Sequence, residues 1–245
     1  MREHIKKIWK YSTRPLLKVY ARNFSLHVDN YPHLPVAGAY SQFGQDVFVL
    51  KKVFPNKTDG IFVDVGGNHP INCSNTYLLE QSGWHGIAFE PQEKMRDLWP
   101  SLRKTPCLPY VIGPENKTVT FVEAAEGRHG LSGVDHFNKS SEGGIKISLE
   151  QRRLDEILQE QNIHHIDYLS IDVEGYEMEV LKSIDFSRAD ITLISVENDI
   201  GFRWLPLIGK KLGSELGTNS LRKYLEKNGY TYIARIVCDD FFMKK

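Results

Sequence analysis

The chain has 245 residues, of which 41% are hydrophobic and 25% are charged, and its formal net charge at pH 7 is zero. This size and composition are typical of a soluble globular protein with one full core. The balanced charge gives no reason to expect nucleic-acid binding, which needs a concentrated basic surface. The three cysteines have no CxxC spacing. This argues against a disulfide framework or a zinc knuckle and favours a cytoplasmic location.

Charge is distributed unevenly along the chain. Residues 1–22 contain seven basic residues and one acidic residue, a net charge of +6, so the remaining 24 basic and 30 acidic residues carry −6. Apolar residues recur in this segment at helical spacing, although Pro15 should interrupt a helix. We expect residues 1–40 to form a basic helical arm and linker, and residues 41–245 to form one domain. The arm could pack on its own domain, pack on a partner subunit in a homo-oligomer, or lie on an anionic membrane surface.

Hydrophobic patterning predicts alternating helices and strands in the first half of this domain. In chain order these are a helix at 42–53, a strand at 60–65, a helix at 74–82, a strand at 86–90, a helix at 94–103 and a strand near 107–113. Parallel strands need crossover connections, and helices usually supply them. The alternation therefore predicts an α/β fold with a mostly parallel sheet and helices on both faces.

The second half begins differently. A strand is predicted at 117–123, and residues 127–144, rich in Gly, Ser, His and Asn, predict a long irregular loop that folds over a substrate. The elements predicted after it are a helix at 149–160, a strand at 167–172, a helix at 177–183, a strand at 191–197, a helix at 220–228, and strands at 230–237 and 241–243.

The first functional motif, Asp64-Val-Gly66-Gly67-Asn68, lies where the predicted strand 60–65 ends. A carboxylate and a glycine-rich turn allow a nucleotide-like ligand to approach the backbone closely. The motif lacks the third glycine of dinucleotide sites, and Pro70 follows it, so a pyrophosphate seat is poorly supported. A smaller, cationic adenosyl ligand fits better. Asp64 could bind the ammonium group of that ligand, or it could cap the loop.

A second carboxylate, Glu90, ends the next predicted strand about twenty-five residues after the glycine turn. This position suits a side chain that binds both hydroxyls of a ribose, as in Rossmann-type sites. The alternative is an exposed glutamate at a strand end.

Two further carboxylates, Asp172 and Glu174, follow the predicted strand 167–172, and Gly175 allows the turn into the next helix. Both could point into the same cleft, where one would act as a general base. Glu177 and Glu179 instead suit the acidic first turn of a helix and should face solvent. The sequence leaves open whether Asp172 or Glu174 is the base.

A divalent metal is a further possibility, because carboxylates are oxygen ligands. Candidate ligands are Asp172, Glu174, Glu197 and Asp199. The His and Cys spacings of stronger metal motifs are missing, so we expect no metal.

Taken together, these segments resemble FkbM-type S-adenosylmethionine-dependent methyltransferases. The matching segments are Ser41-Gln-Phe-Gly-Gln-Asp46, Phe62-Val-Asp-Val-Gly-Gly-Asn68, residues 74–86, Phe89-Glu-Pro91, Leu154-Asp-Glu-Ile-Leu158 and residues 167–181. They cover most of residues 41–200 in the order that the family has them. The resemblance implies a class I, Rossmann-like methyltransferase domain at 41–245, whose mostly parallel sheet ends in an antiparallel strand.

The resemblance also implies S-adenosylmethionine as the cofactor. The expected cofactor-binding residues are Gln45, Asp64, Gly66, Gly67, Asn68, Ser74, Asn75, Glu90, Pro91 and Ile112. Within this set, Asp64 and Asn68 would face the methionine end, Glu90 the ribose and Ile112 the adenine. Asp46 would help Gln45 to cover the cofactor, and Ser74 could equally cap the next helix. His69-Pro70 departs from the usual ending of this loop.

Members of this family commonly methylate hydroxyl groups. The resemblance therefore implies an acceptor hydroxyl on a sugar, on a glycan or glycolipid precursor, or on a secondary metabolite. Aligning this oxygen with the methyl carbon and removing its proton would carry the catalysis. We expect Asp172 and Glu174 to be catalytic. Further candidate bases are His69, His129, His136 and Glu197.

Two other functions share part of the pattern. An NAD-dependent oxidoreductase would use a similar glycine turn and ribose carboxylate, but Asn68, Pro70 and the acidic pair disfavour it. A non-catalytic binding protein would have no need for buried carboxylates, which are costly without a ligand. We expect residues 127–144 and 201–217 to select the acceptor. A lipid-linked acceptor would give the basic arm a role at the membrane.

Overall fold

The computed structural model describes residues 38–124, 132–135, 137, 144–198 and 220–245. The expected basic arm therefore lies almost entirely outside the described residues. So do most of the loop expected at 127–144 and all of residues 201–217.

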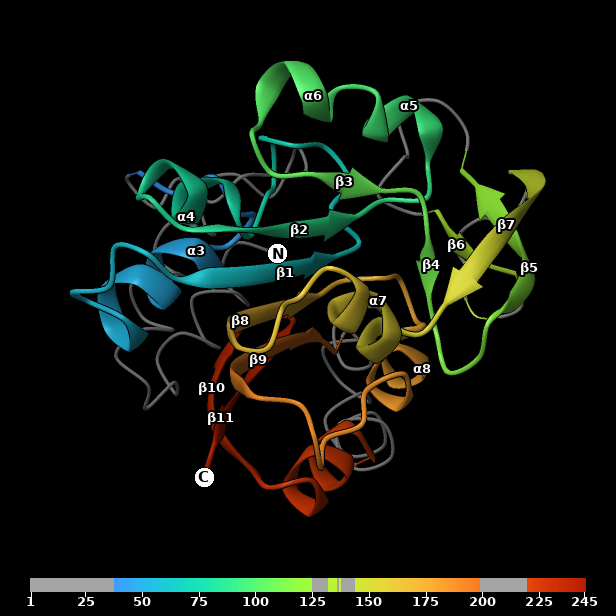
Figure 1. Ribbon diagram of the computed structural model, residues 1–245. Coiled ribbons are helices and arrows are strands. Elements are labelled where there is room, and N and C mark those ends of the chain that lie inside the picture. Colours follow the sequence, from blue (N-terminus) through green and yellow to red (C-terminus); the bar gives the residue numbers. More distant parts are fainter. Residues whose placement is uncertain (1–37, 125–131, 136, 138–143, 199–219) are drawn as a thin grey trace, which may run out of the picture.

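A seven-stranded sheet forms the centre of the described chain (Figure 1), with the strand order β10-β11-β9-β8-β1-β2-β3. The strands are β1 (Ile61–Val65), β2 (His85–Phe89), β3 (Cys107–Leu108), β8 (Ile166–Ile171), β9 (Ile191–Glu197), β10 (Tyr230–Ile236) and β11 (Asp239–Lys244). β3, β2, β1, β8 and β9 pair in parallel, whereas β11 is antiparallel to both β9 and β10. The predicted α/β class, with an antiparallel strand near the C-terminus, is confirmed.

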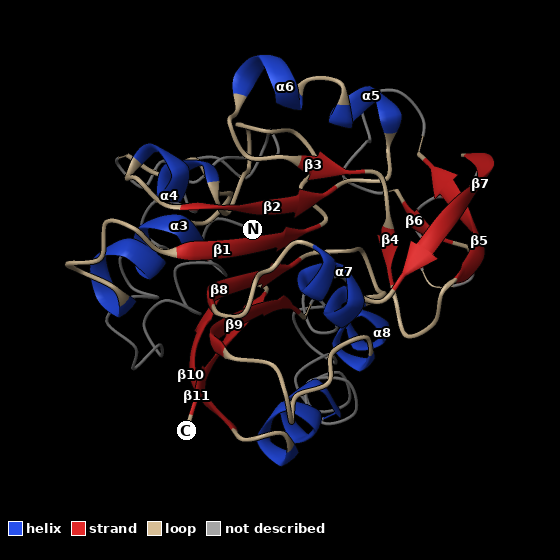
Figure 2. Cartoon of the chain, viewed as in Figure 1, coloured by secondary structure: helices blue, strands red, loops and turns tan. Residues whose placement is uncertain are grey.

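Helices cover both faces of this sheet (Figure 2). The helices of the described chain are α3 (Gln45–Phe48), the π-helical turn η1 (Val49–Val53), α4 (Tyr77–Gln81), α5 (Glu93–Arg96), α6 (Trp99–Leu102), α7 (Leu154–Glu160), α8 (Glu177–Lys182) and one at 220–227, and of these α5 and α6 lie beyond the β3 edge of the sheet. One face packs against α7, α8 and 220–227. The other packs against α3, η1 and α4. Side chains alternate across a strand, so Val63 of β1 joins the first core and Phe62 joins the second.

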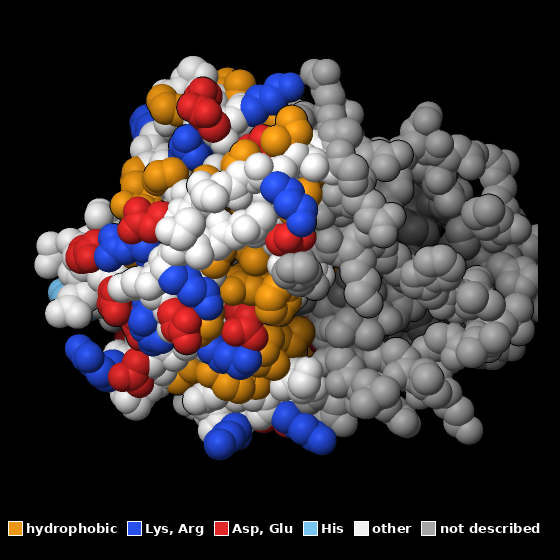
Figure 3. All heavy atoms as spheres, turned by 90° about the vertical axis from the view of Figure 1, so that its right-hand side faces the viewer, with side chains coloured by type: hydrophobic (Ala, Val, Ile, Leu, Met, Phe, Trp, Pro, Cys, Tyr) orange, Lys and Arg blue, Asp and Glu red, His pale blue; other side chains and the backbone are white. Residues whose placement is uncertain are grey.

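A smaller second sheet lies beyond the ends at which the arrows of β1, β2 and β3 point (Figure 1). It has the strand order β4-β7-β5-β6, from β4 (Val111–Ile112), β5 (Lys117–Glu123), β6 (Gly133–Val134) and β7 (Ile145–Arg152). Its apolar face packs on Tyr176, next to α8. On the outer side, basic and acidic side chains are interspersed and some hydrophobic ones are visible (Figure 3), and Ile145 is 70% exposed.

Three predicted elements differ from the structure. The helix predicted at 149–160 begins only at Leu154, because residues 149–152 belong to β7. In β7 burial alternates, with half-buried Ile147 and Leu149 between exposed neighbours, which is the pattern of a strand with one covered face. The helix at 94–103 is two short helices, and the strand near 107–113 is divided between the two sheets. The other predicted helices and strands are present, with ends shifted by a few residues. The structure also has a strand that was not expected, β6, within the loop expected at 127–144.

In the described part of the chain, no helix has the length and apolar character needed to cross a lipid bilayer.

Candidate active site

A cavity of about 560 Å³ lies at the carboxyl ends of β1, β2, β8 and β9. In an open α/β sheet this is the edge where ligands bind. Of the predicted site residues, all but Gln45 line it, namely Asp64, Gly66, Gly67, Asn68, Ser74, Asn75, Glu90, Pro91, Ile112, Asp172 and Glu174. The second sheet forms a further wall with Val111, Phe121 and Val134. The fold thus brings together side chains that are distant in the sequence.

Gln45 has a structural role instead of the expected cofactor contact. Its side chain is buried, its Nε2 donates to Oδ2 of Asp239 at 2.6 Å, and its Oε1 accepts the N–H of Phe43 at 2.8 Å. Asp46 similarly accepts the N–H groups of Tyr40 and Ser41. Both side chains therefore hold the start of the domain in place.

Gly66 and Gly67 shape the loop after β1. Both N–H groups donate to the carbonyl oxygen of Phe89 at 3.0 Å, so neither amide is left for a ligand. Gly66 has φ +89°, and a Cβ there would collide with the carbonyl oxygen of Asp172. A Cβ on Gly67 would meet the ring of Trp99. The two glycines thus allow the loop to lie close to β8 on one side and to α6 on the other.

Glu90 is fixed by two backbone hydrogen bonds. Its Oε2 accepts the N–H of Asn68 and its Oε1 accepts the N–H of Gln92, both at 2.7 Å. The side chain is 2% exposed, and burial raises its pKa to about 7. The alternative of an exposed glutamate is therefore wrong. Each carboxylate oxygen keeps a lone pair with which it could bind a ligand hydroxyl.

Asp64 is also buried, with 3% exposure. Its Oδ2 accepts the hydroxyl proton of Thr76 at 2.6 Å. Burial raises the pKa of Asp64, while the Thr76 hydrogen bond and the charge of Arg103 oppose that rise. Among the described residues, no Lys, Arg or His side chain forms an ion pair with this carboxylate, which lines the cavity.

Ser74 and Asn75 each combine a cavity wall with a structural contact. Ser74 Oγ accepts the N–H of Tyr77, the first residue of α4, at 3.1 Å, although the N-cap position of this helix is Thr76, whose side chain makes no capping hydrogen bond. The amide of Asn75 donates to Ser170 Oγ of β8 at 3.1 Å. These contacts bind the segment after the glycine loop to the sheet.

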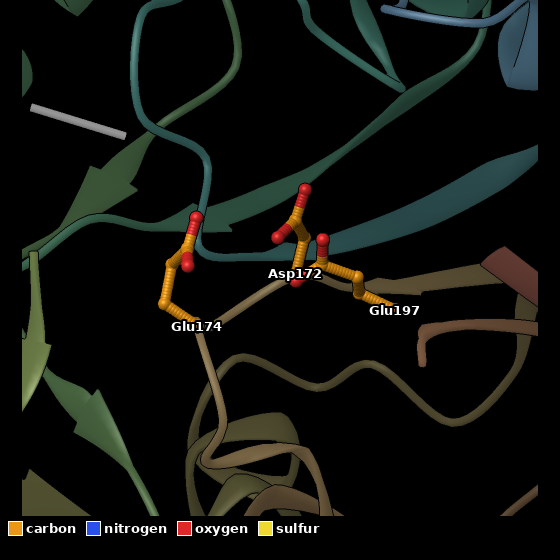
Figure 4. A group of neighbouring side chains, drawn as sticks. All are labelled: Asp172, Glu174 and Glu197. Carbon is orange, nitrogen blue, oxygen red and sulfur yellow. The ribbon is translucent and has the colours of Figure 1, made fainter. Parts of the chain in front are cut away.

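Three carboxylates form an acidic cluster on the other side of the cavity. Asp172 and Glu174 follow β8 and Glu197 ends β9, and oxygen atoms of the three lie within 4.8 Å of one another. Figure 4 shows Asp172 between the other two. The charge of Asp172, then burial and the charge of Glu174, strongly raise the pKa of Glu197. The cluster therefore holds a proton readily and could equally hold a divalent cation. Asp199 lies outside the described residues.

Glu177 and Glu179 lie in the first turn of α8. Glu177 was expected to face solvent, but it is 8% exposed, accepts the N–H of Gly175 at 2.9 Å and has a pKa raised by burial to about 7. The expectation is wrong because the first turn of α8 packs against the body of the domain. Glu179 does form a surface ion pair, with Lys182.

The histidine candidates contribute little to the described cavity. Nδ1 of His69 accepts the N–H groups of Ile71 and Asn72 at 3.1 and 3.0 Å. His69 is not among the cavity-lining residues. His129 and His136 lie outside the described residues.

The sequence pattern missed several residues that shape the cavity. Thr76 and Arg103 support Asp64 from behind. Ser132 Oγ donates to Oε1 of Gln92 at 2.8 Å, which ties the second sheet to the end of β2. Tyr176 Oη donates to Gln151 of β7 at 2.9 Å. The only sequence signal was the closeness of Thr76 and Gln92 to predicted site residues.

The cavity is strongly acidic. Its described lining includes five carboxylates, from Asp64, Glu90, Asp172, Glu174 and Glu197, and no Lys, Arg or His. A ligand with positive charge is therefore favoured, and a ligand with exposed phosphates is disfavoured.

Comparison with known proteins identifies the family of this chain. Residues 64–232, more than half of the chain, match the family model described as the Methyltransferase FkbM domain. The chain belongs to this family of methyltransferases, and its sheet has the Rossmann-like fold of class I methyltransferases.

Two individual proteins are similar to it. Methyltransferase sdnD from Sordaria araneosa is 32% identical over 101 residues, which are 38% of this chain and 36% of that protein. The match thus spans little more than a third of the relative. The crystal structure of Methyltransferase FkbM from Methylobacillus flagellatus KT is 9% identical and has a TM-score of 0.49, over 98% of this chain and 58% of that one.

Proposed function

We propose that the protein transfers a methyl group from S-adenosylmethionine to a hydroxyl group on a sugar, on a glycan or glycolipid precursor, or on a secondary metabolite. The observation that carries this proposal is the charge of the cavity. Five carboxylates line it, and its described lining has no basic side chain. S-adenosylmethionine bears a sulfonium and an ammonium group. The pyrophosphate of NAD would face carboxylates without a compensating cation, so the oxidoreductase alternative is disfavoured.

The residues at the ends of β1 and β2 fit this cofactor. Asp64 is available for the ammonium group, and Glu90, held by Asn68 and Gln92, is available for the ribose hydroxyls. Ile112 supplies an apolar wall for the adenine. When bound, the cofactor supplies an electrophilic methyl carbon on a positively charged sulfur. The protein has to hold the acceptor oxygen in line with this carbon and exclude water.

The acidic cluster fits the role of the base. A carboxylate of the cluster would take the proton of the acceptor hydroxyl while that oxygen bonds to the methyl carbon and the methyl–sulfur bond breaks, with S-adenosylhomocysteine as the leaving group. Asp172 and Glu174 are the proposed catalytic residues. The charge of Asp172, burial and the charge of Glu174 raise the pKa of Glu197.

Cofactor binding can be tested by calorimetric titration of the purified protein with S-adenosylhomocysteine and, separately, with NADH. We expect micromolar binding of S-adenosylhomocysteine and a large loss in Glu90→Gln. The matched control is Glu93→Gln, an exposed position of α5, which should bind normally. Preference for NADH, or no binding of S-adenosylhomocysteine, would refute the proposed cofactor.

The methylated atom can be tested with acceptor sets that differ only at the reacting group. Sugars and polyols would be incubated with S-adenosylmethionine next to their amino-substituted counterparts, and the products identified by mass spectrometry. Methylation of the hydroxyl compounds supports the proposal. Methylation of the amino compounds alone would reassign the enzyme to nitrogen.

Contact of residues 1–22 with an anionic membrane is also a proposal, and it rests on their net charge of +6. Sedimentation with vesicles that contain anionic lipid tests it. Binding that persists unchanged when Lys6, Lys7 and Lys10 are changed to Glu would rule it out. Light scattering of the full chain would decide whether it forms a homo-oligomer.

A further inference from the structure

A buried cation lies behind the cavity wall. Arg103, just after α6, is 6% exposed, and its Nε pairs with Oε2 of Glu80 in α4 at 2.9 Å. Its guanidinium group lies over the ring of Trp99, with 4.6 Å to the ring centroid. Trp99 in turn contacts the glycine loop, because its Nε1 donates to the carbonyl oxygen of Asn68 at 3.0 Å. Arg103 is therefore held rigidly next to the loop that follows β1.

Arg103 reaches the cavity wall through two side chains, because its Nη1 donates to Oγ of the cavity-lining Ser74 at 3.3 Å and also contacts Thr76. Its Nη1 lies 3.1 Å from Oγ1 of Thr76, and this oxygen lies 2.6 Å from Oδ2 of Asp64. A guanidinium group can only donate hydrogen bonds, so the Thr76 oxygen is an acceptor toward Arg103. The single hydroxyl proton of Thr76 is then free to point only toward Asp64. A donor fixed in this direction stabilises an ionised carboxylate.

The surroundings of Asp64 make this support necessary. Asp64 is buried, and burial favours its neutral form. Titratable groups near it are Arg103, Cys107 on β3 and Tyr168 on β8, and burial raises the pKa of both Cys107 and Tyr168 far above neutrality. Cys107 and Tyr168 are therefore uncharged at neutral pH. Glu90 and Asp172 line the same cavity and add only negative charge. Among the described residues, the Thr76 hydrogen bond and the positive charge of Arg103 are the two influences that lower the pKa of Asp64.

We propose that Arg103 and Thr76 are positioning residues that keep Asp64 ionised and turned toward the cationic amino-acid end of the cofactor. This inference rests on the proposed function. Neither residue is among those that line the cavity. Both residues act through Asp64, so replacing either one should change how cofactor binding depends on pH.

The first test does not depend on any ligand. The ionisation of Asp64 is followed by carboxyl ¹³C NMR, with the resonance assigned from Asp64→Asn. Thr76→Val removes the hydroxyl at similar volume, and Thr76→Ser retains it. We expect the Asp64 titration to move upward by about one to two pH units in Thr76→Val and to stay in place in Thr76→Ser. An unchanged titration in Thr76→Val would overturn the inference.

The second test uses two ligands. S-adenosylhomocysteine has the amino-acid end, whereas methylthioadenosine lacks it. In Thr76→Val we expect S-adenosylhomocysteine affinity to fall about tenfold or more at a pH between the Asp64 titration points that NMR finds for wild type and for Thr76→Val, and to recover above both, while methylthioadenosine affinity stays within about twofold of wild type. An equal loss of both ligands at every pH would indicate a merely structural role for Thr76 and overturn the inference.

The outcomes also separate this inference from the proposed function. If wild-type protein binds neither ligand, the proposed function fails and the cofactor contact of Asp64 fails with it. The NMR titration still decides whether Thr76 sets the charge of Asp64. Arg103→Lys, which keeps the charge but loses the fork of donors, should raise the Asp64 titration in the same direction as Thr76→Val if the Arg103 contact orients the Thr76 proton. No upward shift in Arg103→Lys would remove Arg103 from the proposal.

Discussion

The N–H of Asn68 donates to Oε2 of Glu90 at 2.7 Å, so the glycine loop after β1 is bonded to the carboxylate that follows β2. The N–H of Gln92 bonds to the other oxygen of the same carboxylate. One side chain therefore both shapes the cavity and offers a ligand contact. A replacement of Glu90 by Gln should therefore weaken ligand binding, whereas a replacement by Ala should also lower the stability of the fold.

Glu90→Gln should weaken S-adenosylhomocysteine binding by about tenfold to a hundredfold, because hydrogen bonds to a charged group contribute about 1.5–3 kcal/mol. Glu90→Ala should also lower the free energy of unfolding by about 1–3 kcal/mol, since the buried N–H of Gln92 and the partly buried N–H of Asn68 lose their acceptor. Urea unfolding and calorimetry measure the two effects. An alanine variant as stable as wild type would show that these hydrogen bonds do not hold the loop.

Gly66→Ala should destabilise the fold by more than about 3 kcal/mol, because the new Cβ would collide with the carbonyl oxygen of Asp172. Gly229→Ala is the matched control. Gly229 has the same φ of +89° but nothing within 4 Å of the added Cβ, so it isolates the cost of the backbone conformation, about 1 kcal/mol. Equal losses of unfolding free energy in Gly66→Ala and Gly229→Ala, measured by urea unfolding, would contradict the role of the close approach between Gly66 and Asp172.

Glu177 should make the stability of the protein depend on pH. Its pKa rises on folding to about 7, so the stability that it contributes is fully present below about pH 4.3, its ordinary unfolded pKa, and is lost as the pH rises through 7. Glu177→Gln keeps an oxygen for the N–H of Gly175. We expect it to be about 2–3 kcal/mol more stable than wild type at pH 8 and little different at pH 4.5. A variant that is less stable at pH 8 would contradict this assignment.

Asp172→Asn should lower kcat by about 10²- to 10⁴-fold, the usual contribution of a general base, with little change in the affinity for S-adenosylhomocysteine. Glu179→Gln, outside the cavity lining and paired with Lys182, should leave kcat unchanged. If Asp172→Asn keeps its activity and Glu174→Gln loses it, the base is Glu174. Steady-state kinetics on the acceptor found by the product screen distinguish these outcomes.

Treatment with EDTA should leave methyl transfer unchanged, since the sequence lacks the stronger metal motifs. The measurement is activity after chelation and after addition of Mg²⁺ or Mn²⁺. Loss of activity that either ion restores would assign a cation to Asp172, Glu174 and Glu197, whose oxygen atoms lie close enough to share one.

The sequence by itself determined where the functional carboxylates stand along the chain. Asp64, Glu90 and Asp172 each occur at or just after the end of an apolar strand, and parallel pairing of β2, β1 and β8 necessarily brings such ends to one edge of the sheet. The α/β class and the order of its elements follow from the same local periodicity. These features depend on neighbours close in sequence, which a pattern can display.

Only the tertiary structure decided which distant side chains meet. Gln45 bonds to Asp239 across 194 residues, and Arg103 bonds to Thr76 across 27. Glu197 joins the acidic cluster because β9 lies next to β8. The hairpin strand β7 was mistaken for helix at 149–152, because its covered face exists only once the second sheet packs on Tyr176. Such contacts arise from packing between elements, and periodicity along a single segment carries no record of them.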